Sequence, residues 1–238
     1  MKDVSRRSFV TGAAAGVAAL GFLGGSEPAA NAQLVWKASE WKIADFRSLV
    51  VHPAQIKQVY DIVQIRGGLF LNNVKNSLNG LQFGFAVPHD QMKIVAALHG
   101  PANMLNFDDY VWKKYGIGEW LNVTDPATGK PAERNIFYPE AAALKTAAAA
   151  NNPDNENSIY QAKSIQALQS RGVQFLCCHT AAEEQARVLI RRNKLTAAPE
   201  EIVKDMLAHT LPGVLVVAAM VAAIALLQAE GHYTYITI

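Results

Sequence analysis

The feature that most constrains the fold of this chain is its alternation of short apolar runs with segments of helical periodicity. Residues 92–98 are apolar except for Lys93 and end in His99-Gly100-Pro101, which is typical of a buried strand of a parallel sheet. Residues 173–177 form a second such run, and helical patterns precede and follow it. Because parallel strands need helical crossovers, this alternation predicts an α/β three-layer sandwich around a central, mostly parallel sheet.

The same patterns place the expected elements along the chain. Five strands are expected, near Leu49, Ile94, Phe175, Val216 and Tyr235. Helices are expected at 56–63, 69–81, 108–118, 158–171, 181–193 and 199–209, and a surface excursion at 122–135. Residues 211–227 carry no charge. Their Pro212-Gly213 start and branched valines favour a strand followed by a buried helix, and a C-terminal membrane anchor is the alternative.

The N-terminus has the three parts of an export signal. Ser5-Arg6-Arg7-Ser8-Phe9-Val10 is similar to the twin-arginine motif, a weakly apolar run follows at 13–23, and Ala30-Asn31-Ala32 has the small-x-small pattern of a cleavage site. We therefore predict a signal peptide at 1–32, recognition by the twin-arginine translocase, and a periplasmic protein exported already folded. The remaining 33–238 fits one domain of about two hundred residues.

Charge and composition limit the partners. The formal net charge is +2 from 22 basic and 20 acidic residues, with no basic patch, so no nucleic-acid partner is expected. Phosphate-binding glycine loops, nucleophile elbows and dinucleotide fingerprints do not occur in the sequence, and no cofactor is predicted.

The two cysteines, Cys177 and Cys178, are adjacent and cannot form a stapling disulfide framework. They follow a predicted strand, so we expect Cys177-Cys178-His179-Thr180 and His99 at the carboxyl edge of the sheet, where ligands bind in such folds. Successive side chains on a strand face opposite sides, so one thiol is expected to be buried and the other to be reactive at a helix N-terminus. The alternative is that both are small core residues.

Two further groups of residues are candidates for binding. A metal site is one possibility, because copper or zinc would suit a sulfur ligand from Cys178 and imidazole ligands from His179 and His99. No spaced pair of ligands supports such a site. The predicted helix at 69–81 carries four asparagines on one side, which serve either ligand recognition or solvation: Asn72, Asn73, Asn76 and Asn79.

Four segments carry a family resemblance: HPAQIKQVYD, VAALHGPANMLNFDDYVWKKYGIG, GVQFLCCHTA and LPGVLVVAAMVAAIALLQAEGHYTYI. In this order they resemble segments of exported DsrE/DsrF-like proteins, a family associated with sulfur oxidation and sulfur relay. The resemblance implies an α/β sandwich that forms homo-oligomers, trimers or hexamers. It also implies a persulfide-carrying cysteine near the third strand, which either Cys177 or Cys178 matches.

Three functional hypotheses follow. The first is a sulfur-handling protein that uses Cys177 or Cys178 with a sulfur-transfer partner, and has His99, His179, Thr180 and Asn76 as ligand contacts. The second is a non-catalytic oligomeric module that binds a ligand or partner. The third is a metal-binding protein that uses cysteine and histidine.

Overall fold

The computed structural model describes residues 35–139 and 152–238. The predicted signal peptide and the alanine-rich run at 141–150 lie outside these residues. The stretch Leu34–Ile238 forms one compact unit.

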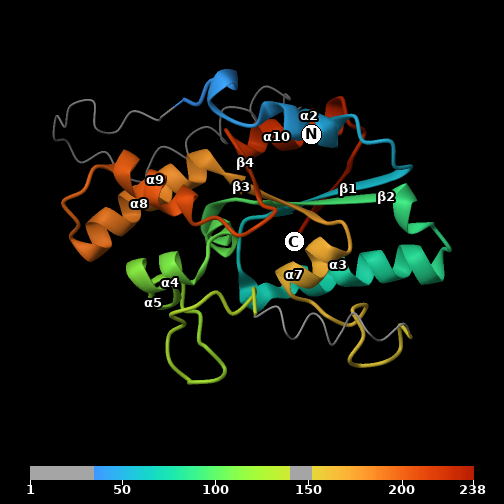
Figure 1. The fold of residues 1–238 in the computed structure, drawn as a ribbon, viewed down its shortest axis with the longest axis horizontal. Helices are drawn as coiled ribbons and strands as arrows, with labels where there is room; N and C mark the ends of the chain where they lie inside the picture. Colours follow the sequence, from blue (N-terminus) through green and yellow to red (C-terminus); the bar gives the residue numbers. More distant parts are fainter. Residues whose placement is uncertain (1–34, 140–151) are drawn as a thin grey trace, which may run out of the picture. The chain divides into compact units, whose positions relative to one another are not determined.

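The centre of the fold is a five-stranded, all-parallel sheet with the order β4-β3-β2-β1-β5 (Figure 1). Its strands are β1 (Ile56–Ile62), β2 (Met92–Leu98), β3 (Gln174–Cys178), β4 (Leu215–Val217) and β5 (Thr234–Thr237). Helices cover both faces, which confirms the predicted three-layer α/β sandwich.

Two helices, α2 (Ile43–Val50) and α10 (Met220–Ala229), cover one face of the sheet, and α3 (Leu69–Asn79) and α7 (Ile165–Ser170) cover the other (Figure 1). The helices α8 (His179–Asn193) and α9 (Pro199–Ala208) pack with the α3 side of the core, as do α4 (Asp109–Tyr115) and α5 (Ile117–Trp120). Short 3-10 turns occur at Ala38–Glu40, Arg66–Gly68, His89–Gln91 and Gly100–Asn106, and a π-helical turn at Gly80–Gly84 extends α3.

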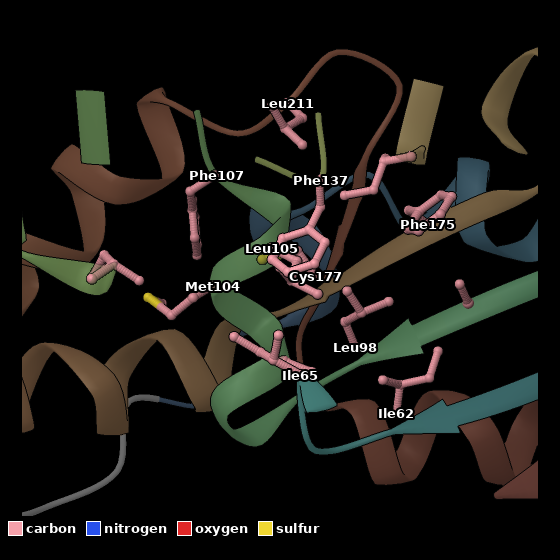
Figure 2. Packing of buried hydrophobic residues seen from close by; sticks show 14 of the residues in the cluster. Ile62, Ile65, Leu98, Met104, Leu105, Phe107, Phe137, Phe175, Cys177 and Leu211 are labelled. Carbon is pink, nitrogen blue, oxygen red and sulfur yellow. The ribbon is translucent and has the colours of Figure 1, made fainter. Parts of the chain in front are cut away.

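The strands contribute alternate side chains to two separate cores, as a pleated sheet covered on both faces requires. The core on the α3 side contains Leu98, Phe175 and Cys177, which Figure 2 shows packed with Ile62 and Met104. The core on the α2 and α10 side contains Val59, Val95, Ala97, Leu176 and Cys178. The neighbouring residues Cys177 and Cys178 therefore face opposite sides of the sheet.

The strand expected near Leu49 and the helix expected at 56–63 are both wrong. Phe46, Leu49 and Val50 have the i, i+3, i+4 spacing of a helix face and are buried on α2. The polar residues of β1 made it resemble a helix, but their side chains have partners in the fold. Gln58 accepts a hydrogen bond from Ser77 on α3, and Asp61 bonds across the sheet edge.

The helix expected at 158–171 is shorter than predicted. It begins after Ser164, whose hydroxyl accepts a hydrogen bond from the Ala167 amide at 3.2 Å, so residues 158–163 form turns. The expected helix at 108–118 ends earlier, at Gly116, which has φ +63°. The excursion at 122–135 is irregular as expected, yet Asp125, Ala132 and Asn135 are buried, so it packs onto the core.

The apolar stretch at 211–227 folds as β4 followed by α10, which confirms the predicted strand and helix. The helix is buried on one side only, and Val221 is 70% exposed. Among the described residues, no helix has both the length and the apolarity needed to cross a bilayer.

Candidate functional site

The carboxyl edge of the sheet separates the two cysteines by their surroundings. Cys177 is completely buried in the α3-side core, and burial raises the pKa of its thiol far above the ordinary value. Cys178 is 4% exposed, ends β3 on the opposite face, and is the N-cap residue of α8. Cys178 is thus the cysteine that lies at a helix N-terminus, and it is slightly less buried than Cys177.

Two helix N-termini meet at the sulfur of Cys178. Its Sγ accepts hydrogen bonds from the amide of Ala181 on α8, at 3.4 Å, and from the amide of Met220, the first residue of α10, at 3.3 Å. These helices are 15 and 10 residues long, so each presents a full dipole end to the sulfur. The arrangement arises because β3 runs directly into α8, and only Ala218 and Ala219 separate β4 from α10.

Burial and hydrogen bonding act on the Cys178 thiol in opposite directions. Burial raises its pKa above the ordinary value and is the larger effect, while the amides of Ala181, Met220 and Thr180 lower the pKa. At neutral pH the resting thiol is therefore protonated. The amides would stabilise negative charge on this sulfur whenever a reaction places it there.

Asn103 fixes the backbone of Cys178. This residue lies in the 3-10 turn that follows β2 and its side chain is completely buried. Its Oδ1 accepts from the Cys178 amide at 2.9 Å, and its Nδ2 donates to the Cys178 carbonyl at 3.2 Å and to Gln185 Oε1 at 3.1 Å. Asn106 extends the network by donating to the Leu176 carbonyl at 3.2 Å. The only sign of Asn103 in the sequence is an amide side chain inside an otherwise apolar stretch.

His179 is 2% exposed and lies beneath Trp36, with ring centroids 3.9 Å apart and planes inclined by 27°. Burial lowers its pKa, against smaller opposing effects of Glu183 and Glu40. Its Nδ1 has no hydrogen-bond partner within the described part of the chain. Thr180 has a structural contact, because its hydroxyl donates to the Ala218 carbonyl at 3.0 Å and ties α8 to the end of β4.

His99 belongs to a chain of polar groups at the same edge. Its Nε2 lies 2.6 Å from Asp61 Oδ1, and the other carboxylate oxygen accepts from the hydroxyl of Tyr235 on β5. The hydrogen bond to Asp61 raises the pKa of Tyr235, and burial adds to this.

The structure therefore brings His99, Cys178, His179 and Thr180 to one edge of the sheet, as predicted. Asn76 lies elsewhere: it is exposed on α3, which runs back from this edge toward the amino ends of the strands. Within residues 35–139 and 152–238, no three His, Cys, Asp or Glu side chains gather in a way that could hold a metal ion.

Two grooves of about 650 Å³ each lie in the described region. One runs beside the edge strand β4 and is bordered by Trp36, Trp41 and Glu40. The other lies at the start of α3 and is bordered by the cationic side chains of Arg66 and Lys163. The first groove shares Trp36 with the covering of His179, but Gln174, Gly213 and Val214 place much of it at the amino ends of β3 and β4.

No protein-family model matches this chain, and neither the curated proteins nor the solved structures contain a match. The class that fold and site define is a parallel α/β sandwich with a cysteine held between two helix N-termini. The resemblance to DsrE/DsrF-like proteins stays a prediction.

Proposed function

We propose that this protein is an exported, DsrE/DsrF-like sulfur-handling protein that carries sulfane sulfur on Cys178. The observation that carries the proposal is the pair of backbone amides, one from each of two helices, that point at the Cys178 sulfur. A thiolate and a persulfide anion are both stabilised by such donors.

The loading reaction needs no cofactor. Cys178 loses its proton and attacks the outer sulfur of a donor persulfide, R–S–SH, and the S–S bond of the donor breaks. Cys178 then holds the sulfur as a persulfide and the donor leaves as R–SH after it takes up the proton. The amides of Ala181 and Met220 favour this step because they stabilise the attacking thiolate.

Intact-protein mass spectrometry of the folded protein after incubation with a persulfide donor tests the proposal. We expect the wild type and Cys177→Ala to gain the mass of sulfur and Cys178→Ala to gain none. Cys177→Ala is the matched control, because it removes the neighbouring thiol from the opposite face of the sheet. A wild type that gains no sulfur, or a Cys178→Ala variant that gains as much as the wild type, would refute the proposal.

Export and assembly are proposed on the sequence patterns and the family resemblance. Arg6→Lys with Arg7→Lys is expected to keep the protein out of the periplasm, which cell fractionation measures. Analytical ultracentrifugation of the mature chain is expected to give a trimer or hexamer.

A further inference from the structure

We infer that His99, positioned by Asp61, takes the proton from an acceptor thiol when sulfur leaves Cys178 and returns that proton to Cys178. The inference rests on the proposed function and deepens it, because it identifies the acceptor as a thiol compound and assigns a role to two residues outside the helix N-termini.

The register of the sheet places His99 beside Cys178. The last paired residues of β2 and β3 are Leu98 and Cys177, so His99 and Cys178 each stand one position further along neighbouring strands. Both residues keep extended backbone angles, with φ −145° for His99 and −91° for Cys178. Neighbouring strands lie about 4.8 Å apart. Alternation gives His99 the same face as Ala97, which lies in one core with Cys178.

Asp61 orients the imidazole. A carboxylate can only accept a hydrogen bond, so Nε2 of His99 donates to Asp61 Oδ1. In the neutral imidazole, Nε2 then carries the proton and Nδ1 has a lone pair. Nδ1 has no hydrogen-bond partner among the described residues. Tyr235 donates to the second oxygen of Asp61, so the carboxylate is held from both sides by strands β2 and β5.

The ends of β1 and β2 are joined without the hydrogen bond between His99 and Asp61. The backbone already joins the ends of β1 and β2, because the His99 amide donates to the Ile62 carbonyl at 3.1 Å and the Ala102 amide donates to the Val63 carbonyl at 2.9 Å. The site also coincides with a topological feature. Strands β2, β3 and β4 follow one another on one side of β1, and β5 is added on the other side of β1. Ligands of open α/β sheets bind where the strand order reverses in this way.

The transfer step balances with an acceptor thiol, R–SH, as the only co-reactant. Nδ1 of His99 takes the thiol proton, and the thiolate attacks the outer sulfur of the Cys178 persulfide. The S–S bond breaks, R–S–SH forms, and Cys178 leaves as a thiolate that the amides of Ala181 and Met220 stabilise. His99 then returns the proton to the Cys178 sulfur, so the site is ready for another loading.

The test separates loading from transfer. Wild type, His99→Ala, His99→Gln, Asp61→Asn and the control His232→Asn are first loaded with a persulfide donor and quantified by intact mass. His232 is a suitable control because it is exposed and has φ +56°, which asparagine tolerates. Loss of sulfur to free cysteine is then timed, with and without imidazole in the buffer.

We expect every variant to reach full loading after a long incubation, because loading is read at its end point. His99→Ala and His99→Gln should transfer on the order of a hundredfold more slowly, the usual contribution of a positioned base. Asp61→Asn should fall between these variants and the wild type, and His232→Asn should match the wild type. Imidazole should restore part of the rate to His99→Ala and none to His99→Gln, which a purely structural role would not produce.

Transfer at the wild-type rate in both His99 variants would overturn the inference and leave the proposed function intact. Slow transfer that imidazole does not restore would also overturn it. Failure of the wild type to load at Cys178 would overturn the proposed function together with this inference.

Discussion

Replacing Asn103 by alanine is expected to destabilise the protein by several kcal/mol. The substitution leaves two buried groups without a partner: the Cys178 amide, which donates to Asn103 Oδ1 at 2.9 Å, and Gln185 Oε1, which accepts from Asn103 Nδ2 at 3.1 Å. The Cys178 carbonyl keeps its intrahelical bond, because Cys178 is the N-cap of α8. Each buried polar group left without a partner costs about 1–3 kcal/mol. The two groups together lower the free energy of unfolding by about 2–6 kcal/mol.

Urea denaturation followed by circular dichroism measures this loss. With an m-value of about 2 kcal/mol/M, the midpoint should fall by about 1–3 M. Asn76→Ala is the matched control, because Asn76 is an exposed asparagine in α3, and its effect should stay within about 0.5 kcal/mol. Equal midpoints for Asn103→Ala and Asn76→Ala would show that the side chain of Asn103 does not hold the end of β3.

Asn103→Asp sharpens the same test. The aspartate has the shape of asparagine but presents a negatively charged acceptor to the Cys178 carbonyl and to Gln185, where the amide donated. The variant should be at least as unstable as Asn103→Ala at neutral pH. It should regain stability as the pH falls, since a protonated carboxyl donates again. A deficit that does not change with pH would contradict the assignment of the Nδ2 contacts.

Three further predictions concern other buried positions. Arg171 is 5% exposed and lies over the Tyr160 ring, and its guanidinium nitrogens have no hydrogen-bond partner among the described residues. Arg171→Met should therefore raise the free energy of unfolding by about 1–4 kcal/mol. A lower urea midpoint would contradict this. A Cβ on Gly118 would lie 2.3 Å from the Ala132 carbonyl oxygen, so Gly118→Ala should lower the free energy of unfolding by about 1–3 kcal/mol or more, again read from urea denaturation. Burial lowers the pKa of His179 below 6.5, so the unfolded chain binds a proton that the folded chain does not, and stability is lost as the pH falls below about 6.5. His179→Gln should therefore show a smaller loss of melting temperature between pH 7 and pH 5 than the wild type, and equal losses would count against this.

The sequence predicted the fold class because most strands and helices have unambiguous patterns. Residues 92–98 and 173–177 are nearly continuous apolar runs, as buried parallel strands are, and Pro199 marks the start of α9. The two errors concern neighbouring segments. Short runs of β-branched and apolar residues, such as those around Leu49, fit a helix and a strand about equally well. Tertiary packing decides between them, and it is not visible in local sequence.

The candidate site was predictable in part. Strand ends that meet at one edge place His99 near Cys178 from sequence alone. The second helix N-terminus at Cys178 was not predictable, because Met220 is 42 residues away in the chain and reaches the sulfur only through the order of the strands. Asn103, Asp61 and Tyr235 were missed for the same reason. Their partners are 75, 38 and 174 residues distant, and their residue types are ordinary on any surface.

The placement of Cys177 and Cys178 on opposite faces of the sheet has a chemical consequence. Many thiol proteins rely on a resolving cysteine that attacks a modified partner and closes a disulfide within the same chain. Here the two sulfurs lie on opposite faces of the sheet, so Cys177 cannot reach a group bound to Cys178 while β3 stays intact. A group that became bound to Cys178 would therefore have to leave by reaction with another molecule, although the sequence contains two adjacent cysteines.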